Sequence, residues 1–386
     1  MRITTLLLLV FFSLNTCKNE TPMTESSAID YELFVGTYTK KEGHVDGKAE
    51  GIGRFKVDQT GALSDFAVVG NQVINPSYLQ LSPDGQWLFA ASETGPDVDT
   101  TGYVYAYRRG EDGNWDYVNR QSSHSFAPCY ISVHSSAPYV LVANYVGGTV
   151  CAYRYSEANG LEPAHSIIRL EGSTAHPRQE SSHPHAAVLG PDEKFCYVPD
   201  LGANKIWIFA FDETDGTLKL KEDATVSVTA EAGPRHLIFH PNGKLAFLAS
   251  ELNNQVSAYR LGTDGYSLEL IAEYSTLPSD FTGESYVADI HLTPDGQHLY
   301  VSNRGHNSLA HFKVGTDGSL STQGHYSVSG DFPRNFNIHP SGKLIYVANQ
   351  NSSNIVSFTL DPASGKLSPL SNYESPTPVC LQFGKP

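Results

Sequence analysis

Arginine and glutamate recur in this chain at spacings that could bring them into one site. Arg235 and Glu251 are 16 positions apart, a separation spanned by two short antiparallel strands and the turn between them. Arg304 and Arg334 occupy similar places in two later segments. Guanidinium groups bind carboxylates and phosphates through paired hydrogen bonds, and they can stabilise the negative charge that develops on a carbonyl oxygen. These residue types therefore indicate a site for a small polar anion or an activated carbonyl group.

A repeated unit must position these side chains. Its strongest copies are PSYLQLSPDGQWLFAASE from Pro76, PRHLIFHPNGKLAFLASE from Pro234 and PRNFNIHPSGKLIYVANQ from Pro333. Weaker copies begin at Pro128, Pro184 and Val287, and a seventh, PVCLQF, begins at Pro378. Each copy alternates short apolar runs with turn residues, which is the pattern of four antiparallel strands. Seven such units predict an all-β fold, a seven-bladed β-propeller.

The two ends of the chain are expected to complete one blade together. The last unit contains only a first strand, PVCLQF. The segments YELFVGTY from Tyr31 and GIGRFKVD from Gly51 can supply the second and third strands. This pairing would remove the free sheet edges that an open sheet must protect. A β-sandwich is the alternative fold, but sandwiches do not require seven near-equal repeats.

Strand direction predicts which side chains share a rim of the propeller. The first strand of each unit starts, and the second ends, at one rim, whereas His240 and His339 lie in turns at the other and are expected to be structural. A rim rich in polar and charged groups suits binding of a small polar anion. The residues expected there are Tyr78, Glu93, Tyr130, Asn144, His183, His185, Asp200, Arg235, His236, Glu251, Asp289, Arg304, Arg334 and Asn349.

Six motifs in order resemble the seven-bladed lactonase family, which includes propeller-type 6-phosphogluconolactonase and fungal carboxy-muconate cyclase. They are FVGTYT at Phe34, NPSYLQLSPDG at Asn75, SHPHAAVLGPDEKFCYVPDLGANKI at Ser182, GPRHLIFHPNGKLAFLASEL at Gly233, YVSNRGHNS at Tyr300 and PRNFNIHPSGKLIYVANQNSSNI at Pro333. The resemblance covers roughly Tyr31 to Phe383. It implies a propeller fold and hydrolysis of a sugar-derived lactone, without a cofactor.

The resemblance also implies a histidine, two arginines and a glutamate at the channel mouth. The arginine–glutamate pair falls on Arg235 and Glu251, the histidine on His185 or less readily on His183, and the second arginine on Arg304, with Arg334 as its rival. Lactone hydrolysis needs a base and stabilisation of an oxyanion. We expect Glu251 or His185 to transfer protons, Arg235 to stabilise the oxyanion, and Arg304 and Arg334 to hold the substrate. Further substrate contacts are expected from His183, His236, Asp200, Asn144 and Glu93.

Two other functions remain open at this stage. One is a cycloisomerase that forms a muconate-type lactone, and the other is a non-catalytic propeller that binds an anion or a protein, because propellers serve both as enzymes and as scaffolds. The loop from Thr39 to Ala49 and the Pro96–Thr101 insert could admit a different lactone. No convincing metal set is present, although Asp200, Asn144 and Glu93 could hold a cation. Cys129, Cys151, Cys196 and Cys380 form no Cys-x-x-Cys pair.

Charge and the first residues bear on partners and location. The formal charge of −15 argues against nucleic acid as a partner. Arg2 and the apolar stretch from Ile3 to Leu14 predict an export signal that is too short to span a membrane. The sequence Leu-Asn-Thr-Cys resembles a bacterial lipobox. We therefore expect a signal peptide at 1–17 with lipidation of Cys17, a linker at 18–30 and the propeller at 31–386, in a periplasmic or membrane-anchored monomer. A cleaved soluble signal is the alternative.

Overall fold

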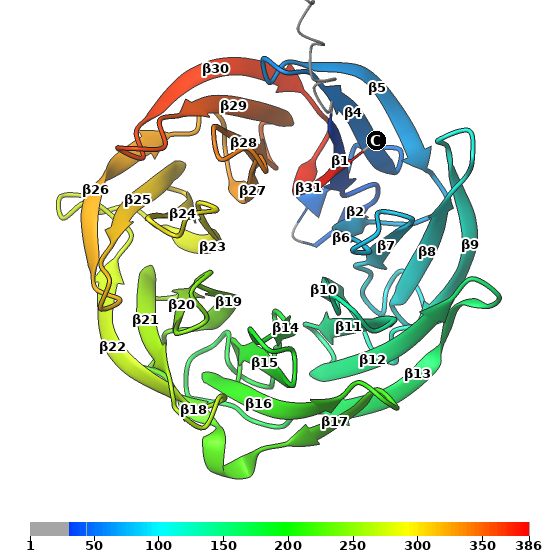
Figure 1. The fold of residues 1–386 in the computed structure, drawn as a ribbon, viewed down its shortest axis with the longest axis horizontal. Helices are drawn as coiled ribbons and strands as arrows, with labels where there is room; N and C mark the ends of the chain where they lie inside the picture. The colour runs from blue at the N-terminus through cyan, green and yellow to red at the C-terminus, as the bar shows by residue number, and fades with distance from the viewer. Residues whose placement is uncertain (1–30, 44, 386) are drawn as a thin grey trace, which may run out of the picture.

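The computed structural model describes residues 31–43 and 45–385. Seven antiparallel sheets surround a central channel in the order in which they occur along the chain, which confirms the predicted seven-bladed propeller (Figure 1). The predicted signal peptide, Cys17 and the linker lie outside the described residues. Within the described ranges no helix is long and apolar enough to cross a membrane, and the short 3-10 turn η1 (Glu222–Ala224) is the single helical element.

The blades are numbered here from the one that contains both chain ends, and their strands are given from the channel outward. Blade 1 consists of β31 (Pro378–Gly384), β1 (Tyr31–Thr37), β4 (Ile52–Val57) and β5 (Leu63–Gly70). Blade 2 consists of β6 (Pro76–Leu81), β7 (Trp87–Ser92), β8 (Tyr103–Arg109) and β9 (Trp115–Ser122). Blade 3 consists of β10 (Pro128–Val133), β11 (Tyr139–Asn144), β12 (Thr149–Ser156) and β13 (Gly160–Arg169).

Blade 4 alone has five strands. It consists of β14 (Val188–Leu189), β15 (Phe195–Asp200), β16 (Lys205–Asp212), β17 (Thr217–Leu220) and β18 (Val226–Ser227), which pairs with β16; blade 5 is β19 (Pro234–Phe239), β20 (Leu245–Ser250), β21 (Gln255–Leu261) and β22 (Leu268–Ser275); blade 6 is β23 (Tyr286–Leu292), β24 (His298–Arg304), β25 (Ser308–Val314) and β26 (Leu320–Ser327); blade 7 is β27 (Pro333–Ile338), β28 (Leu344–Asn349), β29 (Asn354–Leu360) and β30 (Leu367–Glu374).

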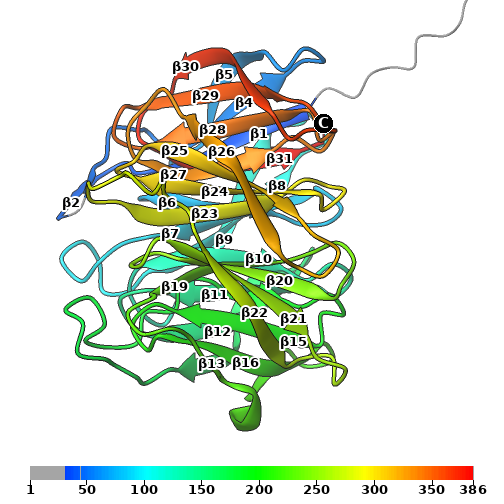
Figure 2. The same ribbon diagram turned by 90° about the vertical axis from the view of Figure 1, so that its left-hand side faces the viewer.

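The chain ends close the ring as the sequence predicts. Strand β31 pairs antiparallel with β1, and β1 pairs with β4, so the last strand of the chain is the innermost strand of the first blade. Figure 1 shows red β31 beside dark blue β1. A small hairpin, β2 (Lys41–Glu42) with β3 (Val45–Asp46), is inserted between β1 and β4 and projects from one rim in Figure 2.

One apolar layer joins each pair of neighbouring blades. Between blades 7 and 1, for example, Leu33 and Val35 pack in one cluster with Tyr346 and Ile355. Six comparable clusters fill the other gaps, so the ring is held by seven layers of buried aliphatic and aromatic side chains. The four cysteines in the described part of the chain are buried free thiols that act as small apolar residues.

Tyrosines in the second strands also bind the next blade, and one of them tests the closing seam. The Tyr346 hydroxyl donates a 2.7 Å hydrogen bond to the carbonyl oxygen of Gly61 across the gap between blades 7 and 1. Tyr346→Phe should lower the free energy of unfolding by about 1 kcal/mol, because the carbonyl loses its partner. Urea denaturation would measure the change. The control Tyr117→Phe, at a half-exposed site on blade 2, should leave stability unchanged.

Bulges in the first strands explain how two consecutive residues both reach the channel. In blade 5, Pro234 pairs with Ser250 and His236 pairs with the preceding Ala249, which leaves Arg235 unopposed. A β-bulge of this kind re-aims a side chain and is common beside active sites. The same shift leaves one residue unopposed in four other blades, namely Ser77, Cys129, Arg334 and Val379.

The second strands end close to the rim of the propeller at which the first strands start. In each blade, one second-strand residue pairs with the proline of the first strand, or with Val287 in blade 6. From blade 1 to blade 7 these residues are Thr37, Ser92, Asn144, Asp200, Ser250, Asn303 and Asn349. The residues that directly follow them in the chain are, in the same order, Tyr38, Glu93, Tyr145, Leu201, Glu251, Arg304 and Gln350. Because neighbouring side chains in extended chain point to opposite sides, these two sets face different surroundings.

Candidate active site

A cavity of about 540 Å³ opens at the rim where the first strands start and the second strands end. Five of the seven positions that follow the second strands line it: Glu93, Tyr145, Glu251, Arg304 and Gln350. The other lining residues are Glu42, Gly95, Ala127, Val146, Arg178, His185, Tyr286, Phe332 and Arg334. The propeller therefore gathers side chains from all seven blades or their connecting loops around one hollow. Five of the fourteen residues expected at this rim line it, namely Glu93, His185, Glu251, Arg304 and Arg334.

Glu251 is the centre of an arginine cluster. Its Oε2 atom lies 3.1 Å from Arg235 Nε and 2.9 Å from Arg304 Nη2, and its Oε1 atom lies 2.7 Å from Arg178 Nη1. Burial by itself would raise the pKa of Glu251, but the three guanidinium charges outweigh it and lower the pKa to about 2. Glu251 is therefore a permanent carboxylate that fixes three cations in place. The predicted contact between Arg235 and Glu251 is present.

Arg235 lies below the cavity, where a buried network holds it. Its Nη1 atom is 3.1 Å from His236 Nε2 and donates to the carbonyl oxygen of Ala288 at 2.5 Å. Since a guanidinium can only donate, His236 Nε2 must accept, and its Nδ1–H then donates to Asp289 Oδ1 at 2.8 Å. Burial and the charge of Arg235 lower the pKa of His236 to about 4, so this imidazole is neutral at physiological pH. His236 positions Arg235 from beneath the cavity.

Arg334 of blade 7 extends toward the next two blades of the ring. Its Nη2 atom lies 3.5 Å from Glu93 Oε1 in blade 2, and its guanidinium carbon lies 5.7 Å from the centre of the Tyr38 ring in blade 1. Burial would lower the pKa of Arg334, but nearby anionic groups, including Glu93, raise it, so the cation persists. Arg334 and Glu93 both line the cavity, and the substrate contacts expected of them remain a prediction.

His185 is the histidine that lines the cavity. Its Nδ1 atom lies 3.7 Å from the Sγ of Cys129, and no residue of the described chain is hydrogen-bonded to its Nε2 atom. Burial raises the pKa of Cys129, so the thiol stays protonated and can donate to the carbonyl oxygens of Ala143 or Pro184 at 3.8 Å. When the thiol donates to one of these carbonyl oxygens, Sγ can accept from a proton on Nδ1. Burial, with the charge of Arg235 next, lowers the pKa of His185 well below 6.5, so the imidazole is neutral at physiological pH.

His183 occupies a different environment from His185. Its Nδ1 lies 2.9 Å from the carbonyl oxygen of Tyr145, and its Nε2 lies 3.0 Å from Glu180 Oε1. Its ring also stacks on Tyr145 with centroids 4.6 Å apart. Both ring nitrogens are therefore engaged, and His183 does not line the cavity. The structure thus favours His185 as the histidine of the site, and His183 supports the Tyr145 side chain.

Asn144 and Asp200, predicted to contact substrate, lie one position before the rim residues and face away from the cavity. Asn144 Nδ2 donates to the carbonyl oxygen of Ser123 in the previous blade at 2.9 Å. Asp200 accepts hydrogen bonds from the Trp207 indole and from the Ser182 hydroxyl. These side chains clamp strands and loops together. Between 31 and 385, apart from position 44, no group of three or more His, Cys, Asp or Glu side chains could hold a metal ion.

Arg178 is the main site residue that the repeat pattern misses. It lies in the long connection between β13 and β14, outside any repeated motif, and its side chain is 42% exposed at the cavity mouth. Besides Glu251, it donates to the Tyr145 hydroxyl at 3.2 Å. The signal in the sequence was the spacing of 56 residues between Pro128 and Pro184, the longest of the series. Tyr145, Gln350 and Glu42 were also missed.

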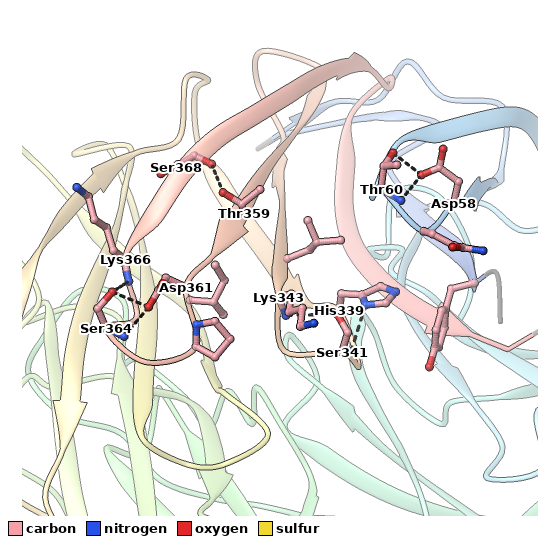
Figure 3. A pocket seen from close by; sticks show the side chains of 15 residues that line it. Asp58, Thr60, His339, Ser341, Lys343, Thr359, Asp361, Ser364, Lys366 and Ser368 are labelled. Atoms are coloured by element: carbon pink, nitrogen blue, oxygen red, sulfur yellow. Dashed lines mark hydrogen bonds between the residues drawn. The ribbon is translucent and has the colours of Figure 1, made fainter. Parts of the chain in front are cut away.

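A second hollow, of about 750 Å³, lies at the other rim between blades 7 and 1 (Figure 3). Its labelled polar side chains mostly bind each other within turns: Asp58 accepts from Thr60, Asp361 accepts from Ser364, and His339 bonds to Ser341. His339 also packs edge-on against Tyr31. At another turn, His240 Nε2 lies 3.1 Å from the carbonyl oxygen of Gly296. These contacts agree with the structural roles expected for both histidines.

The chain is similar to known proteins over most of its length. The family described as "Lactonase, 7-bladed beta-propeller" matches residues 32–383. The chain is 33% identical to a 6-phosphogluconolactonase of Bacillus subtilis over 92% of this chain and 98% of that protein, and 31% identical to one of Formosa agariphila over 88% and 95%. The solved structure of a periplasmic gluconolactonase of Pseudomonas aeruginosa superposes with a TM-score of 0.85 at 32% identity, covering 92% of this chain and 99% of that one. The chain belongs to the seven-bladed β-propeller lactonase family.

Proposed function

We propose that this protein hydrolyses a sugar-derived lactone in the rim cavity. The observation that carries the proposal is the neutral His185, whose unbonded Nε2 shares the cavity with Arg178, Arg304 and Arg334. A base beside a cluster of guanidinium groups is what attack of water on a carbonyl requires. Membership of the lactonase family and relatives named as gluconolactonases support hydrolysis. Neither muconate-type cyclisation nor plain ligand binding has comparable support.

His185 carries the proton in the proposed reaction. The oxygen of a water molecule bonds to the lactone carbonyl carbon, one water proton moves to His185 Nε2, and the carbonyl π electrons become an oxyanion. When the carbonyl re-forms, the bond from its carbon to the ring oxygen breaks. The departing ring oxygen takes the proton back from His185. The product is an open-chain hydroxy acid, which ionises at neutral pH and releases one proton to the solvent.

The arginines supply charge, and Glu251 supplies their positions. A carboxylate with a pKa of about 2 is a poor proton acceptor at neutral pH, so Glu251 is not the base in this mechanism. The oxyanion is stabilised by guanidinium groups that Glu251 holds before the substrate arrives. Three arginines of the cavity lining, Arg178, Arg304 and Arg334, can bind an anionic substituent such as a phosphate through charge-assisted hydrogen bonds.

Base uptake in a pH-stat tests the proposed activity. Glucono-δ-lactone and its 6-phosphate would be offered to the purified protein, and the spontaneous rate would be subtracted. Turnover of at least one lactone that is lost on substitution of His185 would establish the enzyme. Absence of turnover on both substrates and on a wider panel of sugar lactones would rule out the proposal.

Arg178 gives a prediction specific to this site. Arg178→Ala should lower kcat/KM for an anionic lactone by roughly 10- to 100-fold, because a charge-assisted hydrogen bond at the mouth is lost. Initial rates over a range of substrate concentrations would measure the effect. The matched control is Arg108→Ala, which removes an exposed arginine paired with Glu157 on the outer surface and should leave kcat/KM unchanged.

We further propose that the protein is an exported monomer, anchored to a bacterial membrane through Cys17. The apolar segment before Cys17 supports export, and one relative in the family is described as periplasmic. Cys17→Ser should move the protein from the membrane to the soluble fraction, because the thiol that carries the lipid is lost. Cell fractionation and labelling with a radioactive fatty acid would check this. Unlabelled wild-type protein in the soluble fraction would contradict the anchor.

A further inference from the structure

A small hollow lies directly beneath the rim cavity, on the axis of the channel. About 10 Å³ of it is open to the centre of a water molecule, which is roughly the room that one water needs. Glu93 and Arg334 line both this hollow and the cavity above it, so the two spaces adjoin. The bulged residues Ser77, Cys129 and Arg235 form much of its remaining wall.

Two buried polar atoms on the wall of this hollow have no ordinary hydrogen bond. Ser77 is 3% exposed and Glu93 is 7% exposed, and no residue of the described chain makes a hydrogen bond of normal geometry to Ser77 Oγ or Glu93 Oε2. Leaving such atoms unsatisfied costs about 1–3 kcal/mol each, so native proteins usually pair them with protein groups or with ordered water. Both residues line the same space, and a single water molecule there could bond to both.

We propose that this hollow binds the water molecule that attacks the lactone. Ser77 Oγ and Glu93 Oε2 would orient it, and its oxygen would face the carbonyl carbon of a lactone lying in the cavity above. Arg334, which lines both spaces, would contribute a guanidinium charge beside the attacking oxygen and the oxyanion. Glu93 touches the reacting water in this arrangement.

This inference rests on the proposed lactone hydrolysis, and it adds the place from which water attacks. The proton that the water loses still goes to Nε2 of His185, a residue that lines the cavity above the hollow. The arrangement also gives Glu93 a role that Glu251 cannot fill. Glu251 has both oxygens bound to arginines, whereas Glu93 Oε2 has no hydrogen bond of normal geometry and Tyr38 is the side chain that would compete with water for this carboxylate.

Two substitutions of Ser77 test whether the hollow holds the reacting water or serves only in packing. Ser77→Val places methyl groups in the hollow and excludes the water, whereas Ser77→Ala leaves the space and the Glu93 contact. We expect Ser77→Val to lower kcat at least about 100-fold, because a misplaced nucleophile costs about that much, with KM within about threefold of wild type. Ser77→Ala should keep kcat within about fivefold. If the hollow were purely structural, Ser77→Val would lower kcat less than Ser77→Ala, because filling a void is better tolerated than enlarging it.

The readouts distinguish this inference from the proposed function. A high-resolution crystal structure of the wild-type protein should show a water within hydrogen-bond distance of both Ser77 Oγ and Glu93 Oε2, and Ser77→Val should lack it. Thermal melts would confirm that both variants are folded. A dry hollow, or Ser77→Val with wild-type kcat, would overturn the water site while leaving lactone hydrolysis intact. A wild-type protein without turnover would instead refute the proposed function, and with it the role of this water as nucleophile.

Discussion

Glu251→Gln is expected to abolish hydrolysis and to lower the free energy of unfolding by about 3–5 kcal/mol. The substitution removes the one negative charge that Arg178, Arg235 and Arg304 share and leaves three guanidiniums facing each other. Breaking a buried ion pair from one side is costly because the remaining charges are desolvated without compensation. Urea denaturation would give the free energy, and the pH-stat assay would give the rate.

A matched glutamate on the surface provides the control for this prediction. Glu269→Gln breaks an exposed contact of 3.6 Å with Arg260 on blade 5. Exposed pairs contribute about 0–1 kcal/mol, so this variant should retain both stability and activity. If Glu251→Gln were as stable and as active as Glu269→Gln, the arginine cluster would not depend on Glu251, and its description as the anchor of the site would be wrong.

His185→Gln should lower kcat by roughly 100- to 10,000-fold, with a small change in KM. Glutamine fills a similar volume but cannot carry a proton between water and the ring oxygen. The comparison with His183→Gln settles which histidine acts, because both ring nitrogens of His183 already bind protein groups. His183→Gln should lose less than about tenfold in kcat. Equal losses in the two variants would contradict the assignment.

The pH profile provides a second measure of His185. The neutral form is the active base, and burial together with the charge of Arg235 lowers its pKa well below 6.5. Wild-type kcat/KM should therefore stay level from pH 8 to below pH 6.5 and fall only when the imidazole gains a proton at more acidic pH. A fall centred at or above pH 6.5 would mean that His185 is not the group that limits the rate.

The repeat alone was sufficient to predict the fold. Alternating apolar residues and turn residues recur in seven units, and a strand period of two leaves few other arrangements for them. The half-unit at Pro378 and the strand at Tyr31 predicted the shared blade, which β31 and β1 form. The closeness of Arg235 and Glu251 followed from antiparallel pairing over short strands, which is a local property of one hairpin. In the structure Arg235 Nε lies 3.1 Å from Glu251 Oε2.

Other parts of the site depend on details of single residues that a repeat does not reveal. Asn144 and Tyr145 are neighbours in the sequence, but only Tyr145 lines the cavity, because adjacent side chains of extended chain point in opposite directions. If the repeats are aligned one position out of register, a residue that holds two segments together, such as Asn144, is therefore mistaken for a residue that lines the cavity. The same uncertainty of register left His183 and His185 undecided until their contacts were known.

The sequence by itself determined the number of blades, their closure, and the rim to which arginine, glutamate and histidine belong. Tertiary structure alone decided that Arg178, from a loop, binds Glu251 together with two other arginines, and that Ser77 and Glu93 line one small hollow beneath the cavity. The physical reason is the range of the interactions involved. Periodicity encodes contacts within one blade, whereas long loops and bulges are set by how seven blades pack around a channel, and no single segment contains that information.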